Sequence, residues 1–298
     1  MNELNLRAYA KVNLGLDVVR KREDGYHEVS MIMQTVSLYD RLHFEKREEP
    51  GVTLTTNLHF LPVDDNNLVV KAARLLLEEF HISSGVTIHL DKHIPVAAGM
   101  AGGSSDCAAA LFGINRLFDL GLHLEQLKER GVTLGADVPY CLMRGTALSE
   151  GIGEILTPLA PMPDCSIVVA KPPISVSTKY VYEHLDLAHL CHHPDISGMV
   201  NALSDHDLKG ITDRMENVLE SVTENQYPEI RQIKQILLEQ GAMNALMSGS
   251  GPTVFGIFAS EDMAKAAAEK VNESKLAKQI YTVAPYNVIR HKKGGKLC

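Results

Sequence analysis

The sequence predicts an α+β protein built from two domains. Its 298 residues exceed the length at which one hydrophobic core usually keeps growing. The last predicted elements read helix, strand, strand, helix, strand, which is typical of a ferredoxin-like layer. Closely spaced prolines within residues 158–163 interrupt the chain before most of these elements. We therefore expect an N-terminal domain of mixed strands and helices over residues 1–160, a C-terminal ferredoxin-like domain over residues 161–290, and a tail over residues 291–298.

The N-terminal half begins with strand patterns. Residues 8–19 alternate in polarity and predict a strand, and a turn is expected at residues 23–25. A helix is expected over residues 67–80, with Asp64 or Asp65 as its N-cap. Its apolar face consists of Leu68, Ala72, Leu75, Leu76 and Phe80. Further strands are expected around residues 52–54, 86–90 and 146.

The C-terminal half supplies the ferredoxin-like pattern. A helix over residues 229–240 is stopped by Gly241. The other expected helices cover residues 178–185 and 262–272. The expected strands cover residues 166–170, 245–247, 253–258 and 280–289.

Composition and charge indicate a soluble globular chain without a nucleic-acid partner. Apolar residues make up 45% and charged residues 22% of the chain, and the formal net charge is −8. The basic clusters that the sequence shows are residues 20–22 and 291–296. Both are too short to line a groove for nucleic acid and are expected to be solvated.

The cysteines and the N-terminal segment both indicate the cellular compartment in which the protein is expected. The cysteines are odd in number, widely spaced and without a CxxC pair, which favours a reducing compartment. They are Cys107, Cys141, Cys165, Cys191 and Cys298. The N-terminal segment lacks the continuous apolar stretch of a signal peptide, and no segment is long enough to span a bilayer. We expect a cytoplasmic protein without a membrane partner.

Residues 95–106, PVAAGMAGGSSD, carry the strongest ligand signal. They lead into the Ala-rich apolar stretch 107–118, which predicts a loop that opens a helix. Small residues let the backbone approach a ligand, and the free N–H groups and positive dipole end of a helix attract an anion. The alternative is a tight turn with a serine N-cap, but a turn rarely needs so many small residues. We expect an anionic ligand, foremost a nucleotide.

Several familiar catalytic motifs are absent from the sequence. It contains no GxxxxGK[ST], no GxGxxG after a strand and no HRD–DFG set, which excludes the P-loop, Rossmann and protein-kinase classes. HExxH and GxSxG are also missing. One segment has the side chains of a metal site but not its spacing, and we expect it to be a surface segment. It contains His184, His189, Cys191, His192 and His193.

Three separated segments resemble the GHMP small-molecule kinases. They are AYAKVNLGL at residues 8–16, PVAAGMAGGSSD at residues 95–106 and LMSGSGPTVFGIF at residues 246–258. Two more, DGYHE at residues 24–28 and GADVPYCLMRGTALSEGIGE at residues 135–154, resemble the branch of this family that acts on a cytidyl diphosphate ester. The resemblance covers essentially the whole chain in the family's order, and five collinear motifs are far more specific than one glycine loop.

The chain departs mildly from the family pattern within the glycine loop. Ala98 and Ala101 stand where relatives often have glycine, and Met100 stands where leucine is common. Alanine fits a loop that approaches a ligand closely as long as its φ stays negative. The departure puts no role in doubt, although it is expected to reduce the flexibility of the loop.

The resemblance implies a two-domain GHMP-kinase-like fold with an ATP-binding N-terminal domain. It implies transfer of the γ-phosphate of ATP, with Mg²⁺, to the 2-hydroxyl of the methylerythritol part of a cytidyl diphosphate ester in the non-mevalonate isoprenoid pathway. Asp137 would be the general base, and Lys11 would keep it ionised and stabilise the developing alkoxide. From the local sequence alone, Asp137 equally fits a cap or turn, and Lys11 is better explained as a solvated strand lysine.

The other site residues are also implied by the resemblance. ATP would be bound by Pro95, Val96, Ala97, Ala98, Gly99, Met100, Ala101, Gly102, Gly103, Ser104, Ser105, Asn67, Lys92, Ser248 and Gly249. The cytidyl substrate would be bound by Asn13, Tyr26, His27 and Tyr182. Because no clear acidic ligand is evident, we expect no protein metal site, and Mg²⁺ would be held mostly by phosphates and water.

Plainer explanations stay open for several of these residues. Lys92 also fits an exposed strand lysine, and Asn67 a residue at the start of a helix. Tyr26 fits a half-buried aromatic of a hairpin, and Tyr182 a core residue. The segment around Ser248 fits a hairpin turn, which is compatible with a role in binding phosphate.

Two other functions stay open at this point. The chain fits another GHMP kinase that acts on homoserine, mevalonate or a sugar, which would not need an aromatic stack for a base. It also fits a non-catalytic member of the fold that senses a nucleotide or metabolite, although a pure binder has no need of both Lys11 and Asp137. We expect a monomer or a weak homodimer.

Overall fold

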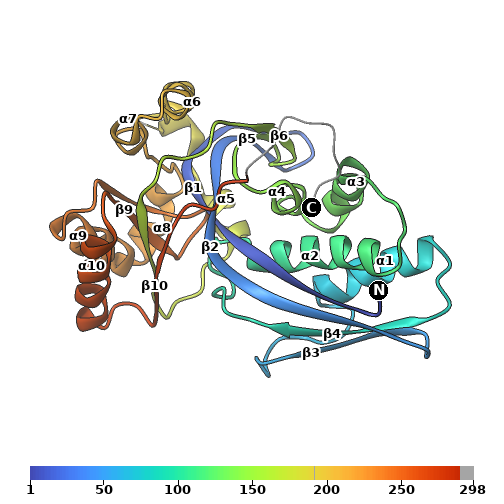
Figure 1. Ribbon diagram of the computed structural model, residues 1–298. Coiled ribbons are helices and arrows are strands. Elements are labelled where there is room, and N and C mark those ends of the chain that lie inside the picture. The colour runs from blue at the N-terminus through green and yellow to red at the C-terminus, as the bar shows by residue number, and fades with distance from the viewer. Residues whose placement is uncertain (191, 289–298) are drawn as a thin grey trace.

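The computed structural model describes residues 1–190 and 192–288, which fold around two β-sheets (Figure 1). The larger sheet has the order β3-β4-β2-β5-β6, and β1 also pairs with β2. Its strands β3 and β4 run parallel, and its other pairs run antiparallel. The strands are β1 (Glu3–Lys21), β2 (His27–Arg47), β3 (Gly51–Thr56), β4 (Gly85–Asp91), β5 (Thr146–Gly151) and β6 (Ile155–Pro158).

β1 and β2 form a long antiparallel ribbon that the sequence predicts only in part. The predicted strand 8–19 lies inside β1, and the predicted turn at residues 23–25 is confirmed, with Gly25 N donating to Arg22 O at 3.2 Å. β2 was not delimited from the sequence. Its residues 31–36 are all buried, and a strand that is buried on both faces lacks the period of two that reveals strands.

Helix α1 (Leu68–Glu79) covers one face of the larger sheet and matches the predicted helix (Figure 1). Its N-cap is Asn67, whose side chain accepts the N–H of Val69 at 2.9 Å. The expectation of Asp64 or Asp65 as the cap is therefore wrong. Asp65 instead forms an exposed ion pair with Arg74 at 2.5 Å.

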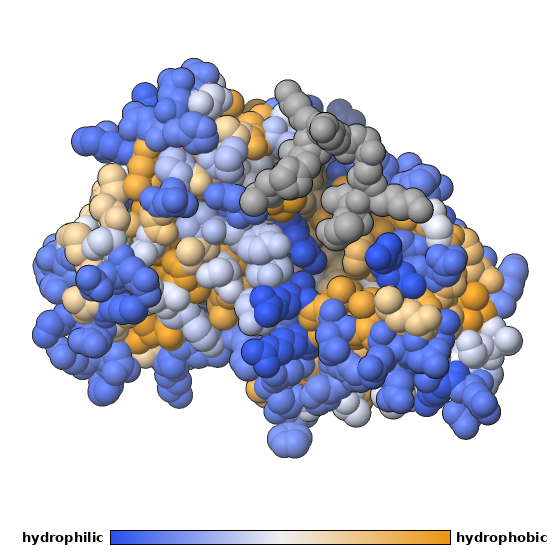
Figure 2. Space-filling view, viewed as in Figure 1, coloured by the Kyte–Doolittle hydropathy of each residue, from blue (hydrophilic) through white to orange (hydrophobic). Residues whose placement is uncertain are grey.

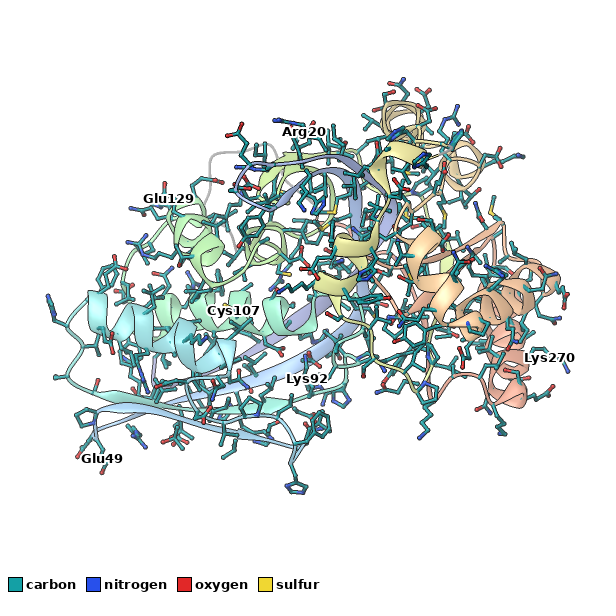
Figure 3. All side chains as sticks on the ribbon, turned by 180° about the vertical axis from the view of Figure 1, so that it is seen from behind. Arg20, Glu49, Lys92, Cys107, Glu129 and Lys270 are labelled. Atoms are coloured by element: carbon teal, nitrogen blue, oxygen red, sulfur yellow. The ribbon has the colours of Figure 1, made fainter. Side chains whose placement is uncertain are left out.

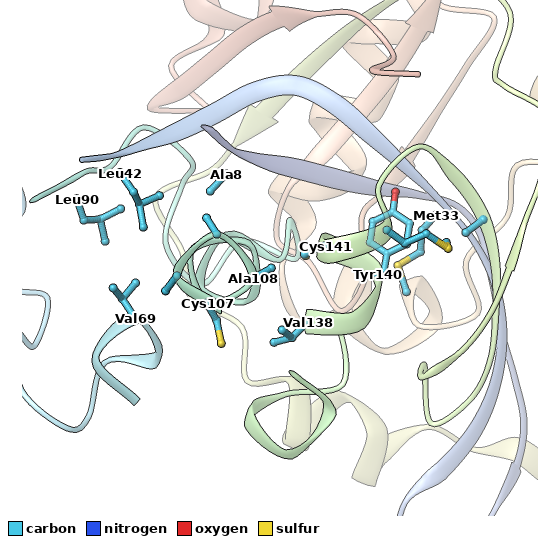
Figure 4. Packing of buried hydrophobic residues seen from close by; sticks show 14 of the residues in the cluster. Ala8, Met33, Leu42, Val69, Leu90, Cys107, Ala108, Val138, Tyr140 and Cys141 are labelled. Carbon is cyan, nitrogen blue, oxygen red and sulfur yellow. The ribbon is translucent and has the colours of Figure 1, made fainter. Parts of the chain in front are cut away.

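Helix α2 (Gly102–Leu117) lies beside α1 and packs very close to the sheet. It begins within the glycine motif, so the expectation that the motif is a loop up to residue 106 is wrong. A Cβ on Gly113 would lie 2.7 Å from the ring of Phe44, which shows that the small residues of α2 permit this close approach. Ala108 and Cys107 of α2 lie in the same buried cluster as Tyr140 of helix α4 (Val138–Met143) (Figure 4).

The smaller sheet confirms the ferredoxin-like prediction. It has the order β10-β7-β9-β8 and is antiparallel throughout, which is the strand order of a βαββαβ unit. The predicted last strand is too long, because β10 ends at Val283 and residue 289 lies outside the described residues. The unit consists of β7 (Ser166–Lys171), α9 (Pro228–Glu239), β8 (Asn244–Met247), β9 (Val254–Phe258), α10 (Glu261–Ser274) and β10 (Gln279–Val283).

Several short helices were missed by the sequence analysis. Between β7 and α9 the chain inserts helices whose outward sides are hydrophilic around α6 and α7 (Figure 2). Short helices held by tertiary contacts give weak periodic signals. The missed elements before β5 are α3 (Leu124–Leu134) and α4 (Val138–Met143). Those between β7 and α9 are the 3₁₀ turn η1 (Leu187–His189), α6 (Ile196–Ser204), α7 (Leu208–Thr212) and α8 (Glu220–Gln226). Helix α5 (Thr178–His184) was predicted.

The middle of β1 joins the two sheets. Ala10, Val12 and Leu14 are fully buried in a core cluster that also contains Val169 of β7 and Phe255 of β9. Because side chains alternate along a strand, the intervening residues of β1 face the opposite side. Lys11 and Asn13 are among these intervening residues, and both line the cavity described in the next section. The expected boundary near residue 160 stays a prediction.

The outer face of the larger sheet gathers cations that are distant in sequence. Arg7 and Arg41 are partners in the β1–β2 register, and both guanidinium groups lie against the ring of Tyr39, at 4.6 and 5.8 Å from its centroid. The guanidinium of Arg144 lies 5.2 Å from the centroid of Tyr9. These arginines are brought together only by the fold, whereas the predicted basic segment at residues 291–296 lies outside the described residues.

No helix in residues 1–190 and 192–288 is long and apolar enough to cross a membrane.

Candidate active site

A cavity of about 960 Å³ lies where the larger sheet, α2 and the smaller sheet meet. Its wall includes residues of β1, the glycine loop, the turn before α4, α5 and the loop after β8. This volume is within the range of ligand pockets in proteins. Three predicted site residues, Met100, Ser105 and Ser248, are absent from its wall, whereas the other predicted site residues line it.

Lys11 projects from β1 into this cleft. Its ammonium group donates to Asn13 Oδ1 at 2.6 Å and to the carbonyl oxygen of Gly99 at 3.0 Å. The Lys11 residue is only 5% exposed, so the description of a solvated strand lysine is wrong. Asn13 is fully buried, and its amide nitrogen faces the sulfur of Met31 at 3.2 Å. The strand alternation that leaves Ala10 and Val12 in the core turns Lys11 and Asn13 to the cleft.

The glycine loop brings free N–H groups to the cleft. Gly102, Gly103 and Ser104 occupy the first turn of α2, where backbone N–H groups have no partner within the helix. Among the described residues, no acceptor is recorded for these three N–H groups. They lie at the positive end of a 16-residue helix, an arrangement that favours an anion.

Two alanines of this loop adopt the left-handed conformation. The φ values of Ala97 and Ala101 are 50° and 54°. The expectation of a negative φ is therefore wrong for Ala101, and it holds for Ala98. A left-handed residue that carries a Cβ is strained, so the loop holds both alanines in a conformation that glycine adopts more easily.

We predict that Ala101→Gly raises the free energy of unfolding by about 0.5–1 kcal/mol, because glycine adopts φ near 54° without the Cβ clash. Urea unfolding followed by circular dichroism measures the change. Ala98→Gly is the matched control. Ala98 is buried and its φ is negative, so this change should destabilise the protein. If both variants lost stability by the same amount, the prediction that the backbone is strained at Ala101 would be contradicted.

Met100 and Ser105 support the loop from behind. Met100 is buried, and its carbonyl oxygen accepts the N–H of Lys11 at 3.1 Å. The hydroxyl of Ser105 donates to Tyr9 O at 2.7 Å and is therefore already used within the protein. Both contacts fasten the glycine loop and α2 to β1.

Lys92 is the centre of a buried ionic cluster. Its ammonium group contacts carboxylate oxygens of Asp40 and of Asp106, the latter at 2.7 Å, and all three side chains are at most 4% exposed. The description of an exposed strand lysine is therefore wrong. Lys92 lies between α2 and the sheet (Figure 3). A Cβ on Gly102 would lie 2.9 Å from Lys92 Nζ, so this charge touches the start of α2.

Asp40 and Asp106 are site residues that the sequence analysis missed. Asp40 also accepts the N–H groups of His93 and Ile94 at 2.5 and 2.7 Å, which fixes the segment before the glycine loop. Burial raises the pKa of Asp106 well above its usual range, although the charge of Lys92 opposes this shift. Asp106 ends the motif PVAAGMAGGSSD, and this acidic residue beside two serines was the available signal.

Asp137 immediately precedes α4 and lines the cleft. It occupies the N-cap position, but its side chain makes no capping hydrogen bond, so the cap description does not account for the carboxylate. Burial raises the pKa of the Cys141 thiol, the charge of Asp137 raises it further, and the charge of Lys11 lowers it. The carboxylate of Asp137 and the ammonium group of Lys11 therefore both lie near enough to the Cys141 thiol to shift its pKa.

The aromatic residues lie at one end of the cleft. Tyr26 is 61% exposed, so the description of a half-buried hairpin residue is wrong. The rings of His27 and Tyr182 lie 5.1 Å apart and are tilted by 37°. On α5 the core residue is Val181, and Tyr182 is half-buried. Burial raises the pKa of Tyr182, and the charge of Asp137 contributes to this shift.

The loop after β8 closes the cleft from the smaller sheet. It is the predicted hairpin, since β8 and β9 are antiparallel neighbours. Gly249 lines the cleft, whereas Ser248 is fully buried and donates its hydroxyl to Gly99 O at 2.9 Å. The hydroxyl groups of Ser250 and Thr178 lie 2.8 Å apart, which links this loop to α5. The sequence analysis missed Ser250 and Thr178, because their partners are remote along the chain. It also missed Asn217, whose amide nitrogen donates to the carbonyl oxygens of Met247 and Gly249.

The described residues contain no group of three or more His, Cys, Asp or Glu side chains that could hold a metal ion. Within the histidine-rich segment, His192 faces Glu216 at 2.8 Å and His193 faces Asp17 at 2.9 Å. His189 faces Asp186 at 2.8 Å. Cys191 lies outside the described residues.

Comparison with known proteins gives a consistent result. The family models for the GHMP kinases N terminal domain and the GHMP kinases C terminal match residues 67–145 and 185–277. A 4-diphosphocytidyl-2-C-methyl-D-erythritol kinase of Lachnoclostridium phytofermentans is 56% identical over 286 residues, which are 96% of this chain and 95% of that protein. A protein of the same description from Alkaliphilus oremlandii is 49% identical over 288 residues, or 96% and 98% of the two chains.

Solved structures agree in fold. A crystal structure of 4-(cytidine 5'-diphospho)-2C-methyl-D-erythritol kinase is 33% identical with a TM-score of 0.82, and the match covers 95% of this chain and 100% of that one. A homoserine kinase from Cytophaga hutchinsonii has a TM-score of 0.75 at 21% identity, with 95% and 94% covered. The latter likeness concerns the fold alone.

Proposed function

Because this chain belongs to the GHMP kinases, and among them to the 4-diphosphocytidyl-2-C-methyl-D-erythritol kinases, we propose that it phosphorylates 4-diphosphocytidyl-2-C-methyl-D-erythritol at the 2-hydroxyl. The chain is an ATP-dependent small-molecule kinase, and the proposed step belongs to the non-mevalonate isoprenoid pathway. The observation that supports it best is one cleft lined by Lys11, Asp137 and the free N–H groups at the start of α2.

We place the triphosphate of ATP against the glycine loop. The N–H groups of Gly102, Gly103 and Ser104 would donate to phosphate oxygens, as expected at a helix N-terminus. Asn67 and Lys92 also line the cleft and would lie beside the nucleoside, with the ammonium group of Lys92 already bound by Asp40 and Asp106. Mg²⁺, when bound with ATP, would neutralise phosphate charge. Ser104 lines the cleft and is the side chain of this turn that fits a contact to the hydrated ion.

Asp137 and Lys11 would handle the acceptor hydroxyl. The acceptor oxygen forms a bond to the γ-phosphorus while the bond from this phosphorus to the β,γ-bridging oxygen breaks and ADP leaves. Asp137 takes the hydroxyl proton, and the ammonium group of Lys11 stabilises charge on the acceptor oxygen. The free Asp137 side chain supports this role, because no capping bond competes for it.

The aromatic end of the cleft would hold the cytosine base. Tyr26 is exposed beside His27 and Tyr182, and aromatic rings give a base large stacking area at low entropic cost. Asn13 lines the cleft, but its oxygen is occupied by Lys11, so its contribution to substrate binding would come through the orientation of Lys11.

We predict that Tyr26→Ala raises KM for the cytidyl substrate by about 5- to 100-fold, the cost of one lost base stack, and leaves KM for ATP unchanged. Steady-state kinetics with each substrate varied measures both constants. Tyr26→Phe keeps the ring and should stay near the parent. Phe60→Ala removes a similarly exposed aromatic that does not line the cleft, and it should have no effect. An equal rise of both KM values in Tyr26→Ala would contradict base stacking.

A substrate panel tests the proposed function directly. We expect rapid ATP-dependent phosphorylation of the cytidyl diphosphate ester and little turnover of homoserine, mevalonate or a sugar, measured as ADP release. Comparable turnover of homoserine or mevalonate would replace the proposed substrate by that of another GHMP kinase. Binding of nucleotide without turnover of any acceptor would favour a sensing protein.

A further inference from the structure

The carbonyl oxygen of Gly99 is shared by the two halves of the molecule. It accepts the ammonium group of Lys11 from β1 at 3.0 Å and the hydroxyl of Ser248 from the loop after β8 at 2.9 Å. A carbonyl oxygen has two lone pairs and satisfies both donors. Within the described part of the chain, the other acceptor of the Lys11 ammonium group is Asn13 Oδ1. The position of Gly99 O therefore decides where the end of a flexible lysine lies.

The backbones at Gly99 and Ser248 are in direct contact, and the position of Ser248 is fixed by hydrogen bonds. Ser248 is fully buried, and its N–H donates to Thr253 O at 2.8 Å. Its carbonyl accepts the N–H of Gly251 at 3.0 Å. A Cβ on Gly99 would lie only 2.1 Å from Ser248 O. The two loops thus touch backbone to backbone at this point.

Asn217 clamps the loop on both sides of Ser248. Its amide nitrogen donates to Met247 O and to Gly249 O, each at 2.8 Å, and its amide oxygen accepts the N–H of Leu219 at 3.0 Å. Asn217 is 3% exposed and does not line the cleft. A buried amide that is fully used on backbone groups fixes those groups in place.

We infer that Ser248 and Asn217 are positioning residues that set the location of the Lys11 ammonium group through Gly99 O. Ser248 is thereby assigned to the support of the lysine in place of a contact with ATP. The inference rests on the proposed function, in which Lys11 acts at the acceptor oxygen. Lysine is a point charge on a four-carbon stem, and small misplacements of a catalytic group are costly.

The decisive experiment is a double-mutant cycle between Ser248→Ala and Lys11→Met. In the parent, Ser248→Ala should lower kcat about tenfold, the value of one hydrogen bond, with KM for ATP within about twofold. In the Lys11→Met background the same change should lower kcat no further. An equal loss in both backgrounds, or a loss confined to KM for ATP, would overturn the inference.

Ser149→Ala is the matched control for this cycle. Ser149 is also fully buried and also donates its hydroxyl to a glycine carbonyl, that of Gly153 at 2.7 Å, but it does not line the cleft. Its kcat should equal that of the parent. Asn217→Asp, which keeps the side-chain shape but loses both donors, should behave as Ser248→Ala does, and an unchanged kcat there would remove Asn217 from the inference.

A measurement without turnover separates this inference from the proposed function. Acetic anhydride should acetylate Lys11 faster in Ser248→Ala than in the parent, because a less constrained amine is more accessible; mass spectrometry of tryptic peptides reads the rate. A parent without activity on the cytidyl ester, together with faster acetylation, would reject the proposed substrate alone. An unchanged acetylation rate with a normal parent activity would reject the positioning role alone.

Discussion

Asp137→Asn is expected to lower kcat by about 10²- to 10⁴-fold, the range for a positioned general base, while the affinity for ATP changes little. Asparagine keeps the shape of the side chain and cannot accept the hydroxyl proton. The stability of the fold should change by less than about 0.5 kcal/mol, because the carboxylate makes no capping hydrogen bond to α4. Rapid-quench single-turnover kinetics measures the chemical step, and fluorescence titration with an ATP analogue measures binding.

The size of this loss tells two roles apart. If proton transfer is late in a loose transition state, the loss lies at the lower end of the range. Asp137→Glu, which keeps the carboxylate but displaces it, should retain more activity than Asp137→Asn if the base matters most. Near-normal turnover of Asp137→Asn would show that this residue merely orients the acceptor.

Gly99→Ala is expected to abolish ATP binding and to destabilise the protein by about 4 kcal/mol or more, a size reserved for severe clashes. The new Cβ would lie 2.1 Å from Ser248 O and 3.2 Å from Gly251 O, both backbone atoms that cannot swing away. The φ of Gly99 is also +71°, which disfavours alanine. Urea unfolding and titration with an ATP analogue measure the two effects.

Gly121→Ala separates the clash from the backbone strain. Gly121 has φ of +72°, nearly the value at Gly99, but no atom of residues 1–190 or 192–288 lies within 4 Å of its added Cβ. The Gly121→Ala variant should therefore lose only about 1–2 kcal/mol of its free energy of unfolding and should still bind ATP. Equal losses at the two glycines would mean that the close contact between the loops contributes nothing.

The glycine motif and the proposed catalytic pair, Lys11 and Asp137, differ in how much the local sequence predicts about them. The small residues at 95–106 predicted an anion-binding helix start from local chemistry alone, and α2 begins there at Gly102. Neither Lys11 nor Asp137 carried a local signal that separates a site residue from a solvated or capping one. Their importance came from the resemblance of collinear motifs, and the placement of both in one cleft came from the fold.

Other parts of the site have no local signature because their partners are far away in the chain. Asp40 and Asp106 meet at Lys92, and Asn217 reaches the loop at residues 247–249. A buried carboxylate or amide is recognisable only by what it contacts, since the same residue types are usually exposed. The left-handed φ of Ala101 is likewise imposed by its surroundings against the preference of the residue.

Hydrophobic periods and small-residue motifs are local properties of the chain, so they predicted the α+β class, the ferredoxin-like C-terminal unit and the glycine loop, and the collinear motifs indicated the family. The folded chain was needed to show that Lys11 is buried and held by Asn13 and Gly99, that Lys92 lies between two carboxylates, and that the hydroxyl of Ser248 is used within the protein. These facts depend on strands and loops that meet across long stretches of chain, and burial and hydrogen-bond partners exist only once they have met.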